Sequence, residues 1–355
     1  MKRTFWLILL LALLIPTATA LAQDDNNTEP AVRPQLPTAY MLNGFTYHAQ
    51  MWNNCGPATL TMALSYFGYR DNQVRAADWL KPNTEDKNVS PWQIVEYVNN
   101  EVPELPIYAM KRYGGTIDML KTLVFNGFPV MIEAGYDPER ANQGWMGHYL
   151  LVIGYDDAEQ VVYTLDSYDG QDGNPLPYSY AHINEHWQHF NYVYIPFYES
   201  GMEPLLRELL GTDADEQQNY INAFNRAQTE AIADNSDPFA WFNMGSMLVE
   251  LEMYEDAEIA YDQARDLGLP WRMLWYQFGP YEAYYAVGRY DDMLELANTI
   301  VENSSGYVEE AYFYAGLARA ALGETDRAIA NFNTALNFNP NFVPAREQIE
   351  ALRSG

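Results

Sequence analysis

The sequence predicts two structural classes in one chain: an α+β domain over residues 39–198 and an all-α repeat domain over residues 199–355. In the first part, short runs rich in β-branched and aromatic residues alternate with helical patterns, and such runs vanish after residue 198. The second part is rich in Ala, Leu and Glu, and a spacing of about 34 residues recurs in it. A chain of 355 residues is long enough for two domains.

The N-terminus has the features of a secretory signal peptide, which we expect to cover residues 1–22. A basic start precedes an apolar run over residues 5–15, which is short for a bilayer span. The tripeptide Ala-Leu-Ala at residues 20–22 fits a cleavage site, and an uncleaved anchor is the alternative. We expect residues 23–38, which are polar and contain prolines, to be a disordered linker. The mature protein is then expected to be secreted or extracytoplasmic, without a membrane span.

The chain is strongly acidic, with a formal net charge of −28. Nucleic acids and anionic membrane surfaces are therefore poor partners, because their phosphates repel such a chain. The charge favours solubility, and it neither requires nor excludes a cationic partner.

Helix and strand signals alternate in the first domain. We expect helices over residues 57–67, 90–100 and 116–126, and strands over residues 107–110, 128–134, 149–155, 161–165 and 192–198. Ser90 and Pro91 form a typical helix start, with a capping residue before a proline at the first helical position. Asp156 and Asp157 lie between two apolar runs, so we interpret them as turn residues of a β-hairpin rather than catalytic carboxylates.

The second domain carries the spacing of tetratricopeptide repeats. The first copy has Trp241, Gly245, Ala257, Tyr261 and Ala264, and a later copy has Gly316, Ala328, Phe332, Ala335 and Pro340. Between them we expect an irregular copy with Gly288, Tyr290 and Ala297, before them a degenerate copy with Tyr220 and Ala223, and after them a capping helix over residues 347–353. A generic helical bundle is the alternative. We expect the repeats to hold a peptide or protein partner, and a spacer or dimerisation element is the other interpretation.

Cys55 is the only cysteine of the chain, so it cannot form an internal disulfide. It directly precedes the expected helix, whose N–H groups and dipole stabilise a nucleophilic thiolate. Pro57 suits a helix start, and Gly56 allows close approach of a substrate. Gln50 is placed to donate its side-chain amide to an oxyanion, together with the N–H of Cys55. A buried structural cysteine is the alternative.

A nucleophilic thiol requires a base, and the expected hairpin favours His148 among the five histidines. If the turn centres on Asp157, Val152 faces Val162 and His148 faces Asp166. Directly opposed residues lie close enough for the carboxylate to accept the Nδ1–H of the imidazole and to stabilise the imidazolium.

The segments QMWNNCGPATLTMALSYFG, MGHYLLVIGYDD and VVYTLDSYDG resemble the papain-like cysteine peptidases of the bacteriocin-processing, double-glycine leader peptidase family. The similarity covers about residues 40–198 and is strongest to secreted relatives that lack a transporter. It implies a papain-like fold and a catalytic set of Gln50, Cys55, His148 and Asp166. The family usually has a proline after the aspartate, where this chain has Ser167.

These residues predict a secreted cysteine peptidase in which the repeats recruit a substrate or partner. Because the chain has neither the membrane domain nor the ATPase of the transporter-fused members, their substrate class does not carry over. An acyltransferase of the transglutaminase type would use the same thioester chemistry. A non-catalytic scaffold, in which the first domain is a relic, is the third interpretation.

Other residues have structural interpretations that compete with functional ones. His182, His186 and His189 share one face of a potential helix, but no Cys or acidic ligand accompanies them, so we expect no metal and no cofactor. Trp52 and Trp145 flank the expected nucleophile and base in sequence, and they either line a substrate groove or exclude water from the site.

Overall fold

The computed structural model describes residues 36–137, 144–170 and 172–354. The expected signal peptide and almost all of the expected linker lie outside these ranges. Within them, no helix combines the length and the apolar character that a membrane span requires.

The first domain is built on a seven-stranded sheet in which every strand pair is antiparallel. The strands are β1 (Ala39–Met41), β2 (Ile107–Ala109), β3 (Val130–Tyr136), β4 (Met146–Asp156), β5 (Val161–Leu165), β6 (Leu176–Ser179) and β7 (Tyr194–Glu199). Their order across the sheet is β2-β7-β3-β4-β5-β6, and β1 pairs with part of β4. The short strands β1 and β6 were not predicted.

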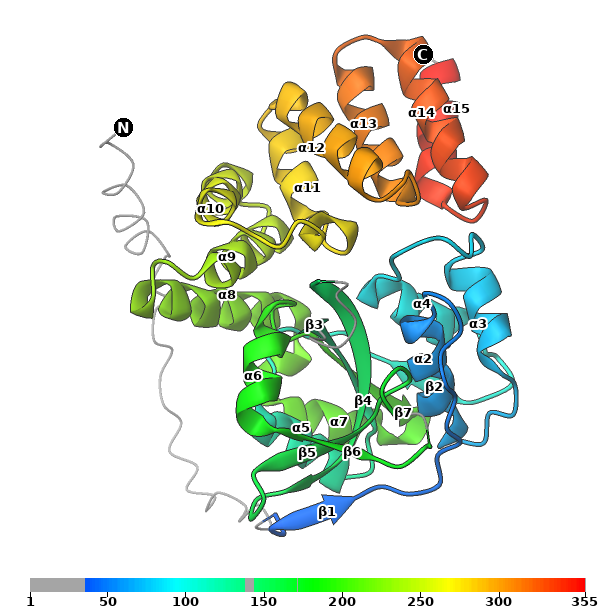
Figure 1. The fold of residues 1–355 in the computed structure, drawn as a ribbon, viewed down its shortest axis with the longest axis vertical. Helices are drawn as coiled ribbons and strands as arrows, with labels where there is room; N and C mark the ends of the chain where they lie inside the picture. Colours follow the sequence, from blue (N-terminus) through cyan, green and yellow to red (C-terminus); the bar gives the residue numbers. More distant parts are fainter. Residues whose placement is uncertain (1–35, 138–143, 171, 355) are drawn as a thin grey trace, which may run out of the picture. The chain divides into compact units, whose positions relative to one another are not determined.

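Six helices accompany the sheet. They are α2 (Cys55–Ser65), α3 (Gln73–Leu80), α4 (Pro91–Glu101), α5 (Ile117–Phe125), α6 (Tyr180–Gln188) and α7 (Glu203–Leu210). In Figure 1, α2, α3 and α4 lie on the opposite side of the sheet from α6. Helix α2 is buried from its second residue to its last, so it forms part of the core rather than a surface layer. The fold class is confirmed as a sheet-containing α+β domain followed by an all-α region.

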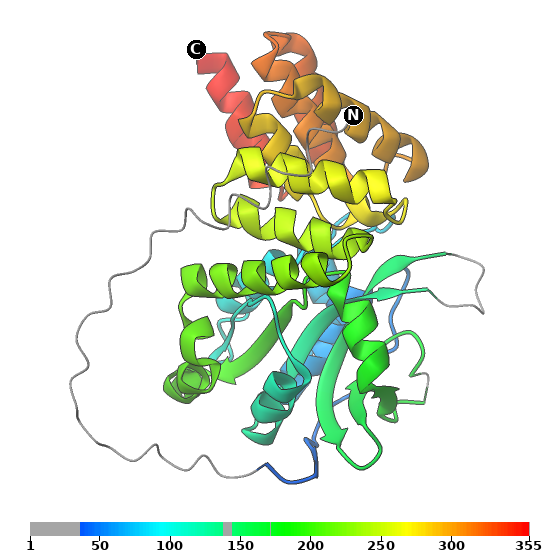
Figure 2. The same cartoon turned by 90° about the vertical axis from the view of Figure 1, so that its left-hand side faces the viewer.

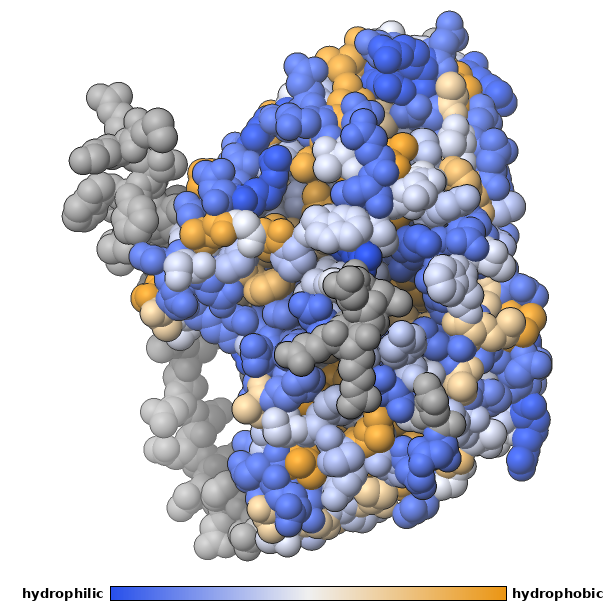
Figure 3. All heavy atoms as spheres, in the orientation of Figure 1, coloured by the Kyte–Doolittle hydropathy of each residue, from blue (hydrophilic) through white to orange (hydrophobic). Residues whose placement is uncertain are grey.

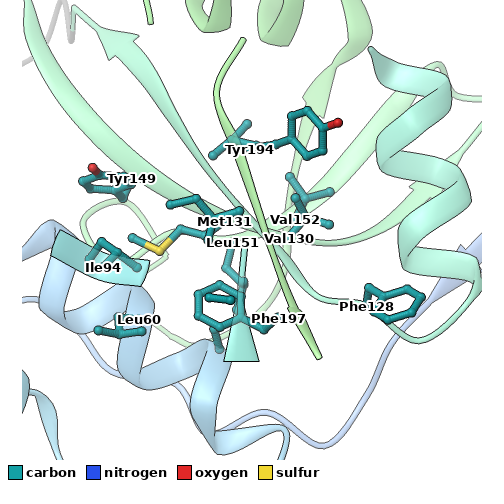
Figure 4. Packing of buried hydrophobic residues seen from close by; sticks show 14 of the residues in the cluster. Leu60, Ile94, Phe128, Val130, Met131, Tyr149, Leu151, Val152, Tyr194 and Phe197 are labelled. Atoms are coloured by element: carbon teal, nitrogen blue, oxygen red, sulfur yellow. The ribbon is translucent and has the colours of Figure 1, made fainter. Parts of the chain in front are cut away.

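The core of the first domain joins α2 and α4 to the central strands (Figure 4). Leu60 and Ile94 project from these helices toward Met131 and Leu151 of β3 and β4, and all four side chains are buried. Burial of a side chain of this size contributes about 1.5–3 kcal/mol relative to exposure. The start of α2 is therefore fixed against β4 by packing along the whole helix.

The register of the β4–β5 hairpin differs from the prediction by two residues. Val152 faces Thr164 rather than Val162, and a bulge between Val152 and Gly154 shifts the pairing once more toward the turn. The turn takes four residues because the Asp156 side chain accepts hydrogen bonds from the N–H groups of Ala158 and Glu159. On the side of the bulge that leads to His148, a slip of two residues leaves the side chains on their expected face, since strand side chains alternate with a period of two.

The second region is a series of paired helices. They are α8 (Glu216–Ala233), α9 (Pro238–Glu250), α10 (Tyr254–Leu267), α11 (Gly279–Ala286), α12 (Tyr290–Asn303), α13 (Glu309–Ala321), α14 (Thr325–Phe338) and α15 (Val343–Ser354). Each of these helices contacts the next one in the chain, and Figure 2 shows this succession from α8 to α15.

The predicted small and aromatic positions of the repeats pack against each other. A Cβ added to Gly245 would lie 2.9 Å from the ring of Tyr261, and one added to Gly316 would lie 2.5 Å from the ring of Phe332. These glycines allow the two helices of a pair to approach closely, as in tetratricopeptide repeats.

The middle pair departs from the prediction. Gly288 lies in the turn between α11 and α12 with φ of +79°, not inside a helix. Ala297 lies as far from the start of its helix as Tyr261 and Phe332 do from theirs, so it occupies the place of the aromatic ring. Tyr281 precedes Ala297 by the same spacing that separates each glycine from its ring, and both residues are buried in one cluster. The large residue is on the first helix of this pair and the small residue on the second, the reverse of the other two pairs. This exchange keeps the volume of the interface and hides the repeat pattern in the sequence.

Polar contacts connect the helical region to the first domain. The guanidinium of Arg112 donates to the carbonyl groups of Asp213 and Ala214, at 2.6 and 2.7 Å. Gly114 packs directly against Ala223 of α8, where an added Cβ would lie 3.3 Å away. The degenerate copy that the sequence predicts around Ala223 is thus the part of the helical region that packs on the sheet domain.

Candidate active site

Cys55 is the first residue of α2, two positions earlier than the predicted helix start. Asn54 occupies the capping position, but its side chain makes no capping hydrogen bond. It bonds instead to Gln73 and Lys81. The N–H groups of the first helical turn therefore remain available to the thiol, and they favour its anionic form.

The environment of the Cys55 sulfur favours the thiolate. Burial alone would raise the pKa of this thiol, but His148 outweighs that effect through a hydrogen bond and its charge, and the N–H groups of Tyr149 and Gly56 add to it. The pKa of Cys55 is lowered as a result. Such a thiol reacts as a nucleophile below the pH at which ordinary cysteines do.

His148 lies near the start of β4 and is buried between Cys55 and Asp166. Its Nε2 lies 2.9 Å from Oδ1 of Asp166. Burial opposes the charged ring, yet Asp166 and Cys55 raise the pKa of His148 to about 10. Both shifts favour a thiolate–imidazolium pair over the neutral thiol and imidazole.

The nitrogen of the His148 ring that contacts Asp166 is not the predicted one. Asp166 binds Nε2 of His148 rather than Nδ1, so Nδ1 is the nitrogen left to bond with Cys55. The strand register explains the difference, because Asp166 follows the last paired residue of β5 and lies beyond the tip of the imidazole rather than beside it.

Asp166 is held rigidly as an ionised carboxylate. Its Oδ1 accepts from the N–H groups of Tyr168 and Asp169 at 2.8 and 3.1 Å, and its Oδ2 accepts from the hydroxyl of Tyr178 at 2.8 Å. Burial would raise the pKa of Asp166, but His148 and these N–H groups hold it well below its usual range. Four donors on one carboxylate fix both its charge and its direction.

Gln50 lies beside the same loop. Its N–H donates to the carbonyl of Ser167 at 2.8 Å, and its Oε1 accepts from the Ser167 hydroxyl at 3.0 Å. Because the oxygen end of the amide is occupied, the amide nitrogen is the end that remains to donate. Ser167, which replaces the proline usual in the family, thus orients the side chain that the sequence assigns to the oxyanion.

Gly56 is buried and packs closely against its neighbours. A Cβ at this position would lie 3.2 Å from Cβ of Val89 and 3.5 Å from the ring of Tyr149. A glycine therefore lets the start of α2 pack tightly against the protein interior.

Two charged residues near the thiol escaped the sequence analysis. Glu133 is 2% exposed on β3 opposite Tyr149, and burial raises its pKa well above the usual range, with the charge of Cys55 adding to the rise. Lys81 is also buried, and its ammonium donates to Asn54 and to the carbonyl of Thr84. Glu133 left one signal in the sequence, because a carboxylate interrupts an otherwise apolar strand run.

The flanking aromatic residues differ in their surroundings. Trp52 is 66% exposed. Trp145 is buried, stacks on Phe190 and donates its indole N–H to Nδ1 of His189 at 3.0 Å. Burial lowers the pKa of His189 to about 3, so its ring is neutral.

The three histidines of the α6 segment do not converge on one point. His182 stacks on His186 with ring centroids 4.1 Å apart, whereas His189 stacks on Phe239. Within residues 36–137, 144–170 and 172–354, no group of three or more His, Cys, Asp or Glu side chains is arranged to hold a metal ion.

Comparison with known proteins gives the first domain a family. Residues 42–195 match the family model described as Peptidase_C39 like family. No curated protein sequence matches the chain significantly.

Solved structures show distant similarity to this chain. A C39-like peptidase from Bacillus anthracis is 18% identical, with 45% of this chain and 97% of that chain covered and a TM-score of 0.32. MamA from Desulfovibrio magneticus RS-1 is 15% identical, with 43% and 83% covered and a TM-score of 0.35. YrrB, a TPR protein with an unusual peptide-binding site, is 16% identical, with 42% and 90% covered and a TM-score of 0.22. Residues 42–195 thus resemble the Peptidase_C39-like family, and a helical region follows this C39-like domain.

Proposed function

We propose that the protein is an exported cysteine peptidase that cleaves peptide or protein substrates. The observation that carries the proposal is the joining of the only thiol, Cys55, to Asp166 through the buried imidazole of His148. A merely structural cysteine requires neither a charged imidazole nor a second buried carboxylate beside it. The match of residues 42–195 to a peptidase-like family supports the same conclusion.

In the proposed reaction the Cys55 sulfur attacks the carbonyl carbon of the scissile peptide bond. The amide of Gln50 and the N–H of Cys55 stabilise the oxyanion that forms. The Nδ1–H of His148 protonates the leaving amine, which leaves an acyl-thioester on Cys55. His148 then takes a proton from water, whose oxygen attacks the thioester and releases the acid. Asp166 keeps the imidazole in place and stabilises its charged form in both steps.

The test is an unbiased peptide-library digest, read by mass spectrometry, with wild type and Cys55→Ala. We expect cleavage by wild type and none by the variant. His148→Ala should lose activity as well, whereas His186→Ala removes an imidazole outside the site and should not. Turnover by Cys55→Ala on a substrate of the wild type would refute the proposal. Conjugation of an added amine, in place of hydrolysis, would show that the acyl group is transferred.

Export and partner recruitment are further parts of the proposal. The basic, apolar and Ala-Leu-Ala segments of residues 1–22 support cleavage and secretion. N-terminal sequencing of the protein from the culture medium should begin at Gln23. The face drawn in Figure 3 is mostly hydrophilic, which suits a solvated surface on which the repeats recruit a polar partner. Deletion of the repeats should then reduce turnover of a folded protein substrate more than turnover of a short peptide.

A further inference from the structure

A groove has walls from both regions of the chain, and one of its lining residues, Glu133, lies near enough to Cys55 to feel the charge of the thiolate. Its volume is about 350 Å³, room for one long side chain. The first domain contributes Trp92, Lys111 and Glu133 to its lining, and the helical region contributes Glu250 and Glu282. Two of these lining residues differ in exposure, because Glu282 is exposed and Glu133 is 2% exposed.

The buried end of the groove adjoins the catalytic residues. Glu133 lies on β3 beside the strand that carries His148, and it is close enough to Cys55 for the thiolate charge to raise its pKa. Tyr276 from the helical region forms the neighbouring wall. A Cβ on Gly147 would lie 3.0 Å from the Tyr276 ring, so this ring packs beside the residue that precedes His148.

Acidic side chains outnumber basic ones in the lining of the groove. It holds three carboxylates and one ammonium, and the ammonium of Lys111 lies 3.6 Å from Glu250. Among the described residues, neither Glu133 nor Glu282 has a basic side chain within 4.0 Å. A buried carboxylate without a cation is costly, and a positive group in the groove would offset that cost.

We propose that this groove is a specificity subsite that binds a basic side chain, Lys or Arg, of the substrate. The inference rests on the proposed peptidase function, because it places the basic residue next to the scissile bond. The guanidinium or ammonium reaches Glu133, the aliphatic stem lies along Tyr276 and Trp92, and the acidic rim attracts it from solvent. The strong negative charge of the whole chain adds to the attraction.

The first test measures binding without catalysis. Butylguanidinium and its neutral isostere butylurea are titrated into full-length Cys55→Ala by calorimetry. We expect butylguanidinium to bind about 10- to 100-fold more tightly, the range for a hydrogen-bonded charge. Adding Glu133→Gln should abolish that preference, and Glu282→Gln should reduce it. Glu302→Gln removes an exposed carboxylate of α12 outside the groove and should leave it unchanged. Equal binding of the two probes, or a preference that survives Glu133→Gln, overturns the inference.

The second test uses wild type and a peptide library in which Arg is compared with citrulline and Lys with norleucine at each position near the cleaved bond. We expect kcat/KM to favour the charged residue at one position, and Glu133→Gln to remove that ratio. Cleavage without such a preference would overturn the subsite and leave the peptidase proposal intact. Tight butylguanidinium binding without any cleavage would support the subsite and overturn the peptidase proposal.

Discussion

Asp166→Asn tests the electrostatic reasoning about the site most directly. The substitution removes the charge and keeps the size, and the amide oxygen can still accept from the N–H groups of Tyr168 and Asp169. In wild type the pKa of His148 rises from 6.5 to about 10, which corresponds to about 5 kcal/mol at 1.36 kcal/mol per pKa unit. Burial opposes this rise, so Asp166 accounts for most of it.

Without the carboxylate, the pKa of His148 should fall toward that of an ordinary imidazole, because burial is then opposed by Cys55 alone. The imidazolium that stabilises the thiolate is lost near neutral pH, and the pKa of Cys55 should return toward about 8.5. At pH 6 an ordinary thiol is only about 0.3% ionised. The rate of alkylation at pH 6 should therefore fall by up to about 300-fold, the full factor applying if the wild-type thiol is fully ionised.

The assay is the second-order rate of iodoacetamide labelling between pH 5 and 10, read by intact mass. Cys55 is the only thiol of the chain, so each added mass reports this residue. Asp172→Asn removes an exposed carboxylate of the same loop and should leave the rate at pH 6 unchanged. If Asp166→Asn labels at pH 6 as fast as wild type while its thermal unfolding is unchanged, the assignment of the ion pair to Asp166 is wrong.

Three further perturbations follow from the contacts. Ser167→Ala removes the hydrogen bond that orients Gln50, so it should lower kcat about tenfold with little change in KM. In a Gln50→Ala background the same substitution should have no further effect. Steady-state kinetics on a cleaved peptide can measure both. Gly316→Ala forces a methyl group against Phe332 and should cost about 1–3 kcal/mol in urea unfolding, whereas Gly201→Ala, which has open space, should not. Glu310→Gln should stabilise by about 1–3 kcal/mol at pH 8 and less at pH 5. Burial raises the pKa of this carboxyl, so the folded state binds more protons than the unfolded state and loses stability as the pH rises, an effect that thermal unfolding at both pH values would reveal.

The sequence predicted the parts of the fold that depend on local pattern. Helix α4 begins at Pro91, as the Ser90-Pro91 signal required, and β5 has the predicted bounds. Helix α3 was not predicted, because it has only three buried residues among eight and its apolar pattern is weak. Strand register depended on the turn, and the Asp156 side chain lengthened the turn by bonds that no periodicity encodes.

The site itself was predictable because its two key contacts tolerate such errors. A helix start misplaced by two residues still leaves Cys55 in the first turn, and a two-residue slip of the hairpin still leaves His148 and Asp166 on one face. The hydrogen bonds that hold the side chains of Asp166 and Gln50 in place could not be predicted. Tyr178 and Ser167 act on Asp166 and Gln50 through single hydrogen bonds whose geometry depends on the folded loop.

The irregular middle repeat has a physical reason that connects the two regions. Between α10 and α11 the chain leaves the helical pattern over residues 268–278 and reaches the first domain. There Gln277 donates to the carbonyl of His189 at 2.9 Å, and the guanidinium of Arg272 donates to the carbonyl of Trp145 at 3.3 Å. These bonds hold Tyr276 against Gly147, the residue before His148. A regular repeat would keep this segment in the helix pair and leave the groove beside Glu133 without its second wall. The local pattern therefore fails where the helical region meets the site, as expected when a segment is shaped by a functional contact rather than by its own repeat.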